Sequence, residues 1–311
     1  LLKDALQPNL VQTTENTPAI VHGGPFANIA HGCNSLLATR MAMAHSEYAI
    51  TEAGFGADLG AEKFYNILCR KSGLRPDLTV IVATAQGLKM HGGVPLDRIK
   101  EPNEEGLRAG LANLDRHVRN LQGFGQTVLV VFNHFAGDTD EEMALLRAHC
   151  EQTLGVPFVI NYAYSDGGAG AAEMAQLVVD TIERRPSGPL QFTYADGDPL
   201  KTKIEKVARG IYGASGVTFA PAALKRLKLA EEGGMPNFPV CLSQKQFSLS
   251  ADAKRYGAAS GFDFQIRDVV INAGAEMIVA IAGDILRMPG LPKDPQANHI
   301  DYIDGEIIGL S

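Results

Sequence analysis

The segment 51–64 has the residue types of a ligand-binding turn. Gly54, Gly56 and Gly60 fall within seven residues, and Phe55 stands between the first two. A backbone without side chains at these positions can come close to a ligand. We expect a buried strand before this turn and a helix after it, and ligands of open α/β sheets bind where strands end and helices begin. An ordinary strand-to-helix turn is the alternative interpretation.

Two aromatic residues occupy similar places further along the chain. Phe135 and Tyr164 follow the apolar runs 127–132 and 157–163, which we predict to be neighbouring strands of a parallel sheet. Right-handed connections put the carboxyl ends of both strands at the same edge of the sheet. Stacking on a flat heteroaromatic ligand contributes on the order of 1 kcal/mol per ring pair. The sequence therefore predicts a site for such a ligand at this edge, with core packing of each ring as the alternative.

Backbone amide groups near the first turn are candidates for anion binding. Gly23 and Gly24 form one glycine pair, and Gly54 and Gly56 flank the aromatic residue of the turn. Several N–H groups that point into one concavity can hold an anion in a nest-type arrangement. We therefore expect these four glycines to contact an anionic ligand.

Charged residues accompany the same turn. Glu52, Asp58 and Lys63 lie within or beside the glycine segment. They are either groups of the binding site or polar residues of a turn and of a helix face. The spacing alone does not decide between the two interpretations.

A second glycine-rich turn, 165–170, lies at the expected amino end of a helix over 171–184. Gly167 and Gly168 are candidate contacts for an anion or a nucleotide, because amide groups at a helix start attract negative charge. The turn lacks the G-x-G-x-x-G spacing of dinucleotide sites. A flexible turn that lines the cleft beside Tyr164 is the alternative.

The cysteines and histidines do not indicate a metal site. The eight histidines are scattered along the chain, and no two of the four cysteines form a C-x-x-C pair. We expect free, buried or half-buried thiols at Cys33, Cys69, Cys150 and Cys241.

The composition is typical of a globular α/β enzyme. The 311 residues are 45% hydrophobic and 20% charged, and 33 glycines suit a fold with many tight strand-to-helix turns. A net charge of −7 argues against nucleic acid or an anionic membrane surface as a partner. The sequence shows neither an apolar run of spanning length nor the basic and apolar start of a secretory signal, so we expect a cytoplasmic protein.

The apolar pattern predicts an α/β fold of parallel-sheet strand–helix units, of the P-loop or Rossmann kind, followed by a smaller α+β C-terminal domain. We expect three domains, with boundaries 1–123, 124–211 and 212–311. Expected helices cover 36–46, 62–71, 103–121, 138–150, 171–184 and 221–232. Expected strands cover 48–51, 78–84, 127–132, 157–163, 240–242, 262–270 and 277–280.

Several long segments of the chain resemble those of one enzyme family. Besides 51–64, they are Val11-Gln12 followed by Glu15-Asn16-Thr17-Pro18-Ala19, His22 to Ser35, Leu88 to Pro95, and Met288 to Lys293. These segments occur in the order found in formate–tetrahydrofolate ligase, also called 10-formyltetrahydrofolate synthetase. The resemblance extends over the whole chain and corresponds to the C-terminal portion of a family member, so 1–123 would be the remainder of its large nucleotide-binding domain.

This resemblance implies an ATP-dependent ligase that joins formate to tetrahydrofolate through formyl phosphate. It implies Mg-ATP and tetrahydrofolate as substrates, a monovalent cation such as K⁺ or NH₄⁺, and a homo-oligomer. Phe55 matches a residue of the catalytic formyl-transfer site, and Phe135 and Tyr164 match residues that flank the pterin of the folate. Two departures stand out, because family members often have tryptophan in place of Tyr164 and proline in place of Ala136.

The ATP phosphate loop of this family is not found in the chain. Such a loop has the pattern Gly-x-x-x-x-Gly-Lys-Ser/Thr, and no Gly-Lys dipeptide occurs anywhere in the sequence. The chain also starts at Leu1 without methionine, as a fragment, a processed piece or half of a split enzyme would. We therefore expect the isolated chain to make no 10-formyltetrahydrofolate. The alternative function is a folate-binding or assembly subunit whose partner chain carries the phosphate loop.

Overall fold

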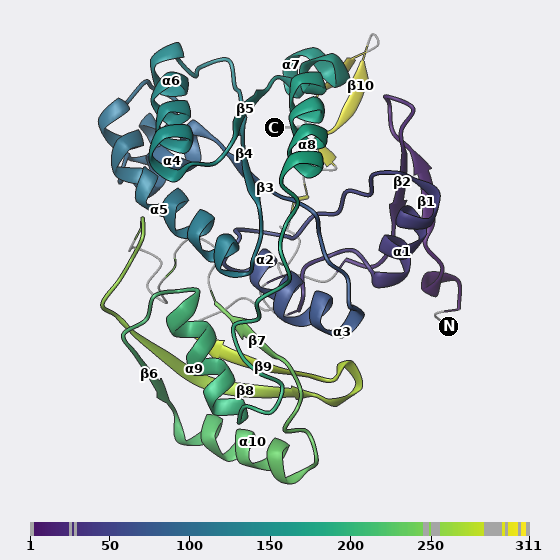
Figure 1. The fold of residues 1–311 in the computed structure, drawn as a ribbon, viewed down its shortest axis with the longest axis vertical. Helices are drawn as coiled ribbons and strands as arrows, with labels where there is room; N and C mark the ends of the chain where they lie inside the picture. Colours follow the sequence, from purple (N-terminus) through teal and green to yellow (C-terminus); the bar gives the residue numbers. More distant parts are fainter. Residues whose placement is uncertain are drawn as a thin grey trace.

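The computed structural model describes residues 3–24, 27, 30–244, 249, 256–282, 294–295, 298–303 and 306–308. Figure 1 shows a parallel sheet with helices on both sides in the upper half and a second sheet with α9 and α10 in the lower half. A two-stranded hairpin and α1 stand at one side of the parallel sheet (Figure 1).

The parallel sheet has three strands. They are β3 (Thr79–Ala83), β4 (Val128–Asn133) and β5 (Phe158–Asn161), in the order β3-β4-β5. Val128 through Phe132 are buried, as expected of a parallel strand that helices cover on both faces. The predicted α/β fold and the parallel pairing of β4 with β5 are confirmed.

Alternate side chains of β4 pack on opposite faces of the sheet. Val128, Val130 and Phe132 belong to the main core, together with apolar residues of α5 (Glu104–Gly123). Leu129 and Val131 pack on the other face against residues of α8 (Ala172–Arg184). This period-two alternation fixes the register of the strand, because a shift by one residue would exchange the two faces.

Helix α5 has the amphipathic pattern that its sequence predicts. The Asn103 side chain caps it by accepting a hydrogen bond from the N–H of Gly106 at 2.8 Å. The five predicted apolar positions are all buried, namely Leu107, Leu111, Leu114, Val118 and Leu121. The helix therefore packs its apolar stripe on the sheet.

Helix α4 (Ala85–His91) approaches α5 backbone to backbone. A Cβ atom at Gly110 would overlap the carbonyl oxygen of Leu88, and one at Gly92 would overlap that of Gly106. These glycines are required because the two helices leave no room for a side chain between them. Helix α6 (Asp140–Ala148), capped by Thr139, continues into the π-helical turn η4 (His149–Leu154) and confirms the predicted helix over 138–150.

The N-terminal region combines a hairpin with short helices. Strands β1 (Asn9–Gln12) and β2 (Pro18–Val21) pair antiparallel, and α1 (Leu36–His45) matches the predicted helix. The predicted helix over 62–71 is present as three consecutive pieces. They are α2 (Gly60–Lys63), the π-helical η2 (Phe64–Cys69) and α3 (Arg70–Ser72).

The predicted buried strand over 48–51 is wrong. These residues form no strand, and the Ile50 side chain is 93% exposed. A strand needs a partner strand, and here only Ala53 pairs, in an isolated bridge with Cys33. The glycine turn is therefore reached through an irregular segment.

The second sheet forms the predicted α+β block. Its order is β6-β8-β9-β7, with β8 antiparallel to β9 and the other pairs parallel. Its elements are α9 (Leu200–Gly210), β6 (Gly216–Phe219), α10 (Pro221–Glu232), β7 (Val240–Ser243), β8 (Asp263–Asn272) and β9 (Met277–Ala282). Short elements elsewhere are η1 (Asp4–Leu6), η3 (Leu96–Arg98), η6 (Ala273–Ala275), β10 (Asp301–Ile303) and β11 (Glu306–Ile308).

The domain boundaries stay a prediction. The boundary at 123/124 falls between β3 and β4, which pair within one sheet. The segment 288–293, which carries part of the family resemblance, lies outside the described residues.

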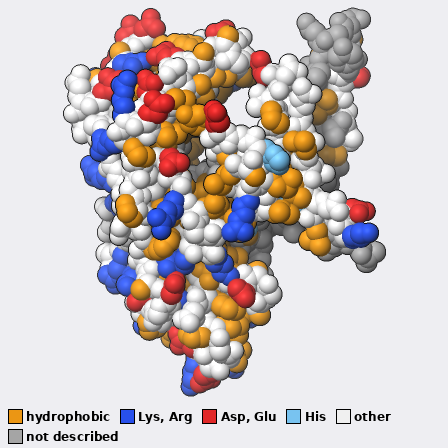
Figure 2. All heavy atoms as spheres, turned by 45° about the vertical axis from the view of Figure 1, so that its right-hand side comes forward, with side chains coloured by type: hydrophobic (Ala, Val, Ile, Leu, Met, Phe, Trp, Pro, Cys, Tyr) orange, Lys and Arg blue, Asp and Glu red, His pale blue; other side chains and the backbone are white. Residues whose placement is uncertain are grey.

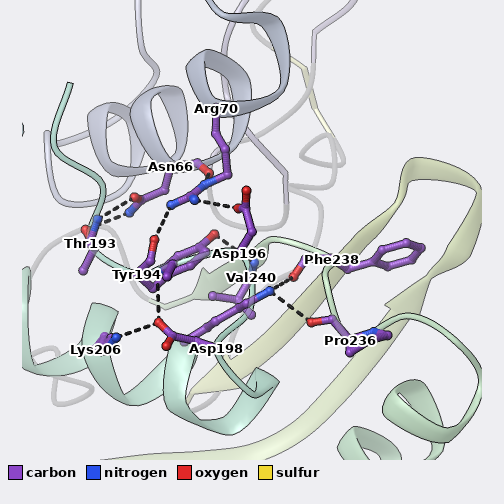
Figure 3. A network of polar contacts seen from close by, with 12 residues as sticks. Asn66, Arg70, Thr193, Tyr194, Asp196, Asp198, Lys206, Pro236, Phe238 and Val240 are labelled. Carbon is purple, nitrogen blue, oxygen red and sulfur yellow. Dashed lines mark hydrogen bonds and ion pairs between the residues drawn. The ribbon is translucent and has the colours of Figure 1, made fainter. Parts of the chain in front are cut away.

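Figure 3 shows a polar network that joins the helix after the glycine turn to the second sheet. Arg70 donates to the Asp196 carboxylate at 2.7 Å and to the Tyr194 carbonyl at 2.8 Å, and its guanidinium stacks on the Tyr194 ring. The fully buried Lys203 donates to the carbonyl oxygens of Pro236 and Phe238 at 3.0 and 3.1 Å. The network thus fixes the α9–β7 region against η2 and α3.

Apolar side chains lie exposed on the face that carries α1 (Figure 2). Leu37 and Met43 of α1 are half exposed, and Val82 of the edge strand β3 is 59% exposed. Parallel sheets are normally covered on both faces, so exposure of this strand is unusual. Within the described part of the chain, no helix combines the length and the apolar character needed to cross a membrane.

We predict that Gly110→Ala destabilises the protein by about 1–3 kcal/mol, because the new Cβ overlaps the Leu88 carbonyl and forces α4 from α5. Gly123→Ala in the same helix is the matched control, since no atom lies within 4 Å of its Cβ position. It should be neutral or stabilising by up to about 1 kcal/mol. Urea unfolding measures both variants, and equal stability of the two would contradict the close packing.

Candidate functional site

Two aromatic rings meet at the carboxyl edge of the parallel sheet. The centroids of Phe135 and Tyr164 are 6.0 Å apart, with 55° between the ring planes. Tyr164 is 87% exposed and Phe135 is half-buried, so neither ring belongs to the core. The structure therefore brings together the two residues that the sequence placed after consecutive strands.

The Phe135 ring is held by a tight turn. The backbone N–H of Phe135 donates to the Asp138 carboxylate at 2.8 Å, and the backbone N–H of Asp138 donates to the Phe135 carbonyl at 2.9 Å. Burial raises the pKa of Asp138. The reciprocal bonds fix the backbone from which the aromatic side chain projects.

Beside this ring pair lie polar residues that were not predicted as site residues. Asn161 donates to the Asn133 side chain at 2.9 Å, and the rings of His134 and Tyr162 have centroids 4.9 Å apart. Their sequence signals are the position at the ends of β4 and β5 and, for Asn133 and His134, the segment Asn133-His134-Phe135 that they share with the aromatic residue. They provide hydrogen-bonding groups next to the aromatic pair.

Tyr164 lies in a helical turn rather than at the start of a loop. The segment predicted as a loop over 165–170 consists of α7 (Ala163–Asp166) and the 3₁₀ helix η5 (Gly167–Ala171). The reason is local, because the Asn161 side chain accepts from the N–H of Ala163 at 3.1 Å and starts the turn. The N–H of Tyr162 then donates to the Gly170 carbonyl at 3.1 Å and closes the segment on itself.

Phe55 occupies the left-handed region of the backbone map, with φ of 63°. Its side chain is 45% exposed, as predicted for a solvent-accessible loop. A bulky residue with positive φ is strained by roughly 1–3 kcal/mol, and such strain concentrates at functional sites. The loop joins an earlier motif, because the N–H of Gly54 donates to the Gly32 carbonyl at 2.7 Å.

Charged side chains are buried beneath the Phe55 loop. Asp58 is 6% exposed and accepts from Gln244 at 3.1 Å, and Lys63 is fully buried and donates to the Ala27 carbonyl. Asp58 lies in the turn and Lys63 in helix α2, but both are buried, whereas Glu52 is exposed. Lys63 anchors the 22–35 motif against the start of the helix.

Glu62 is a fully buried carboxyl whose two oxygens differ in their hydrogen bonding. One oxygen accepts from Asn66 at 2.7 Å, and the other has no hydrogen-bond partner among the described residues. Burial raises the pKa of Glu62 to about 7, although the charge of Lys63 opposes this shift. Burial also raises the pKa of Asp58.

The predicted anion contacts fall in two places. Gly23, Gly24 and Gly56 are exposed and Gly54 is partly buried, so their amide groups lie at or near the surface. Their contact with an anion stays a prediction. No hydrogen bond or ring contact among the described residues joins the Phe55 loop to the Phe135–Tyr164 pair.

The other predicted glycines already hold a carboxylate of the chain itself. The N–H of Gly168 donates to Glu15 at 2.9 Å. A Cβ atom at Gly167 would lie 2.6 Å from the same carboxylate oxygen. The glycine pair therefore accepts an acidic group, but one that comes from the tip of the β1–β2 hairpin.

Three further features of the described residues concern metals, thiols and a surface hollow. No three His, Cys, Asp or Glu side chains gather as a metal site in this part of the chain. The four cysteines are free and buried, which confirms their predicted state. A hollow of about 610 Å³ lies at the amino ends of β4 and β5, away from both aromatic sites.

The fold is that of an α/β protein with an aromatic pair at the carboxyl edge of its parallel sheet. The chain matches the model of the family described as formate–tetrahydrofolate ligase over residues 1–311. It is 70% identical over 311 residues to the formate–tetrahydrofolate ligases of Bacteroides thetaiotaomicron and Bacteroides fragilis. It is 53% identical over 312 residues to that of Symbiobacterium thermophilum.

The chain belongs to the formate–tetrahydrofolate ligase family. In each of these comparisons the match covers 100% of the chain and 56% of the relative. The chain therefore spans a little over half the length of these relatives.

We predict that Phe55→Gly is at least as stable as the original protein and about 1 kcal/mol more stable than Phe55→Ala, because glycine adopts positive φ without strain. Both variants lose only a half-exposed ring. Chemical unfolding measures the difference. A loss of about 3–5 kcal/mol in Phe55→Ala would instead show that the ring is a core residue.

We predict that Glu62 makes stability fall as pH rises from about 4.5 to about 7, the interval between its ordinary and its raised pKa. Across this interval the folded protein binds more protons at Glu62 than the unfolded chain does. The stabilisation is complete below the lower value and is lost as pH passes the higher one. Glu62→Gln should remove this component from urea unfolding measured between pH 4 and 8, and an unchanged slope would contradict the raised pKa.

Proposed function

We propose that the chain provides the folate and formyl side of an ATP-dependent ligase that joins formate to tetrahydrofolate. The observation that carries this proposal is the Phe135–Tyr164 ring pair at the carboxyl edge of the sheet, in a member of the formate–tetrahydrofolate ligase family. The exposed Tyr164 ring has no packing role that would explain its position. A flat pterin is a ligand that two such rings recognise.

The proposed reaction has two steps. A formate oxygen attacks the γ-phosphorus of ATP, which gives formyl phosphate and ADP. N10 of tetrahydrofolate then attacks the formyl carbon, phosphate leaves, and the amine proton is lost to give 10-formyltetrahydrofolate. Positioning of the two reactants contributes most of the rate enhancement in such a reaction.

The residues of this chain have distinct roles in that scheme. Phe135 and Tyr164 hold the pterin, which requires the rings to part from their present 6.0 Å. Phe55 is the apolar wall that keeps water from the labile acyl phosphate. The amide group of Gly56 stabilises charge on the transferred group, whereas that of Gly54 already donates to the Gly32 carbonyl.

Further features of the proposal rest on the family. Mg-ATP and a monovalent cation take part, and no residue of this chain is assigned to either cation. A homo-oligomer or a complementary chain is proposed as partner, and the exposed apolar side chains of α1 and of β3 support it. The proposed location is the cytoplasm.

A catalytically incomplete folate-binding or assembly subunit is the second candidate. The absence of a Gly-Lys dipeptide from the sequence favours it for the isolated chain. The two candidates are separated by where the phosphate-loop polypeptide lies, either in the same chain or on a second chain that copurifies with this one. Both expect no formate-dependent release of ADP by the purified chain alone, and release at the rate of a full-length relative would refute both the expected inactivity of the isolated chain and the subunit interpretation.

We predict that Tyr164→Ala weakens the binding of tetrahydrofolate to this chain by roughly fivefold to tenfold, since one stacking contact contributes about 1 kcal/mol. Phe135→Ala should have a similar effect. Tyr164→Phe is the matched control and should bind as the original does, and Tyr164→Trp should bind more tightly because the indole offers more contact area. Calorimetric titration under reducing conditions measures all four variants, and unchanged binding in Tyr164→Ala would refute the assigned folate site.

A further inference from the structure

The tip of the β1–β2 hairpin is an ordered turn that presents Glu15. The N–H of Asn16 donates to the Thr13 carbonyl, and the N–H of Thr13 donates to the Thr17 carbonyl, both at 2.9 Å. Asn16 adopts a φ of 61°, which asparagine tolerates better than most residues. The side chain of Gln12 donates to that of Asn16 at 2.9 Å. The position of Glu15 is thus set by the turn that carries it.

Glu15 reaches a segment that is distant in sequence. Its carboxylate accepts the N–H of Gly168 at 2.9 Å, across 153 residues. Hydrogen bonds to an ionised acceptor are about twice as strong as neutral ones. The carboxylate also fills the space that side chains at Gly167 and Gly168 would need. The glycine pair and the acidic residue therefore fit one another.

The bound segment is the one that carries Tyr164. Residues 162–170 close on themselves through the bond between the Tyr162 N–H and the Gly170 carbonyl. Tyr164 projects from this closed segment, 87% exposed, and its recorded ring contact is with Phe135. Little packing holds such an exposed turn in place. The fixed contact at Gly168 restricts the positions that Tyr164 can take.

We propose that Glu15 is a positioning residue for folate binding, which acts by holding the 162–170 segment so that Tyr164 stays opposite Phe135. This role rests on the proposed function. It gives a role to Glu15 of the Glu15–Ala19 motif, none of whose residues is assigned to the folate site or the formyl site. Glu15 itself does not touch the ligand. Its loss widens the range of Tyr164 positions and weakens binding without removing a contact to folate.

The test measures tetrahydrofolate binding by the chain and hydrogen exchange of the segment 162–170. Glu15→Ala should weaken binding roughly threefold to tenfold, as expected for loss of one charge-assisted hydrogen bond that orders the site. Exchange at Gly168 should become faster in the same variant. Glu15→Gln keeps an acceptor oxygen and should restore binding to within about twofold.

Two further variants make the outcomes decisive. Glu173→Ala removes an exposed carboxylate from the first turn of α8 and should leave binding unchanged. Equal weakening in Glu15→Ala, Glu15→Gln and Glu173→Ala would show an effect of net charge and overturn the positioning role. Normal binding in Glu15→Ala beside weak binding in Tyr164→Ala would overturn the role of Glu15 and leave the folate site in place.

The remaining outcomes concern the proposed function itself. Normal binding in both Glu15→Ala and Tyr164→Ala would refute the folate site and the positioning role together. Failure of the unaltered chain to bind tetrahydrofolate would do the same. Faster exchange at Gly168 with unchanged binding would confirm the contact but refute its function.

Discussion

Burial of β4 on both faces is the constraint on which the rest of the structure depends. A strand of apolar residues from Val128 to Phe132 has no face suited to water, so helices must cover it on either side. Helix α5 and helix α8 do so, and β3 and β5 pair parallel beside it. Asn133 pairs with Asn161 at the carboxyl ends of β4 and β5, so the segments after the two strands leave the sheet at the same edge. The proximity of Phe135 and Tyr164 follows from this pairing.

The Phe55 loop is shaped by a different kind of constraint, the close approach of backbone to backbone. A Cβ atom at Gly60 would overlap the carbonyl oxygen of Gly54, so the start of α2 packs directly on the preceding turn. The N–H of Gly54 is in turn fixed to Gly32 at 2.7 Å. On the other side of Phe55, the Gly56 carbonyl accepts the N–H groups of Leu59 and Gly60 at 3.0 and 2.9 Å. Between these two fixed neighbours, Phe55 takes the left-handed conformation. The strain at this residue is therefore maintained by contacts on either side of it.

The sequence correctly predicted the helices and strands that are determined by residues within their own segment. The three-and-four spacing of α5, the apolar run of β4 and the proline that starts α10 all act within their own segments, and all three are confirmed. The prediction of a strand over 48–51 was wrong because the apolar pattern of these residues contains no information on a partner strand. The burial of Asp58 and Lys63 was missed for the same reason, since their partners Gln244 and Ala27 are distant in sequence.

The exposed and the buried parts of the candidate site respond to substitution in different ways. Lys89 and Glu142 pair at 3.2 Å with almost no exposure, behind the turn that carries Phe135. Removal of one partner from such a pair leaves an uncompensated buried charge, which costs about 3–5 kcal/mol. Phe55 and Tyr164 are exposed, so their removal costs little stability. A loss of binding without a loss of stability therefore identifies residues that touch or orient the ligand, whereas loss of the buried Lys89–Glu142 pair reduces the stability of the fold itself.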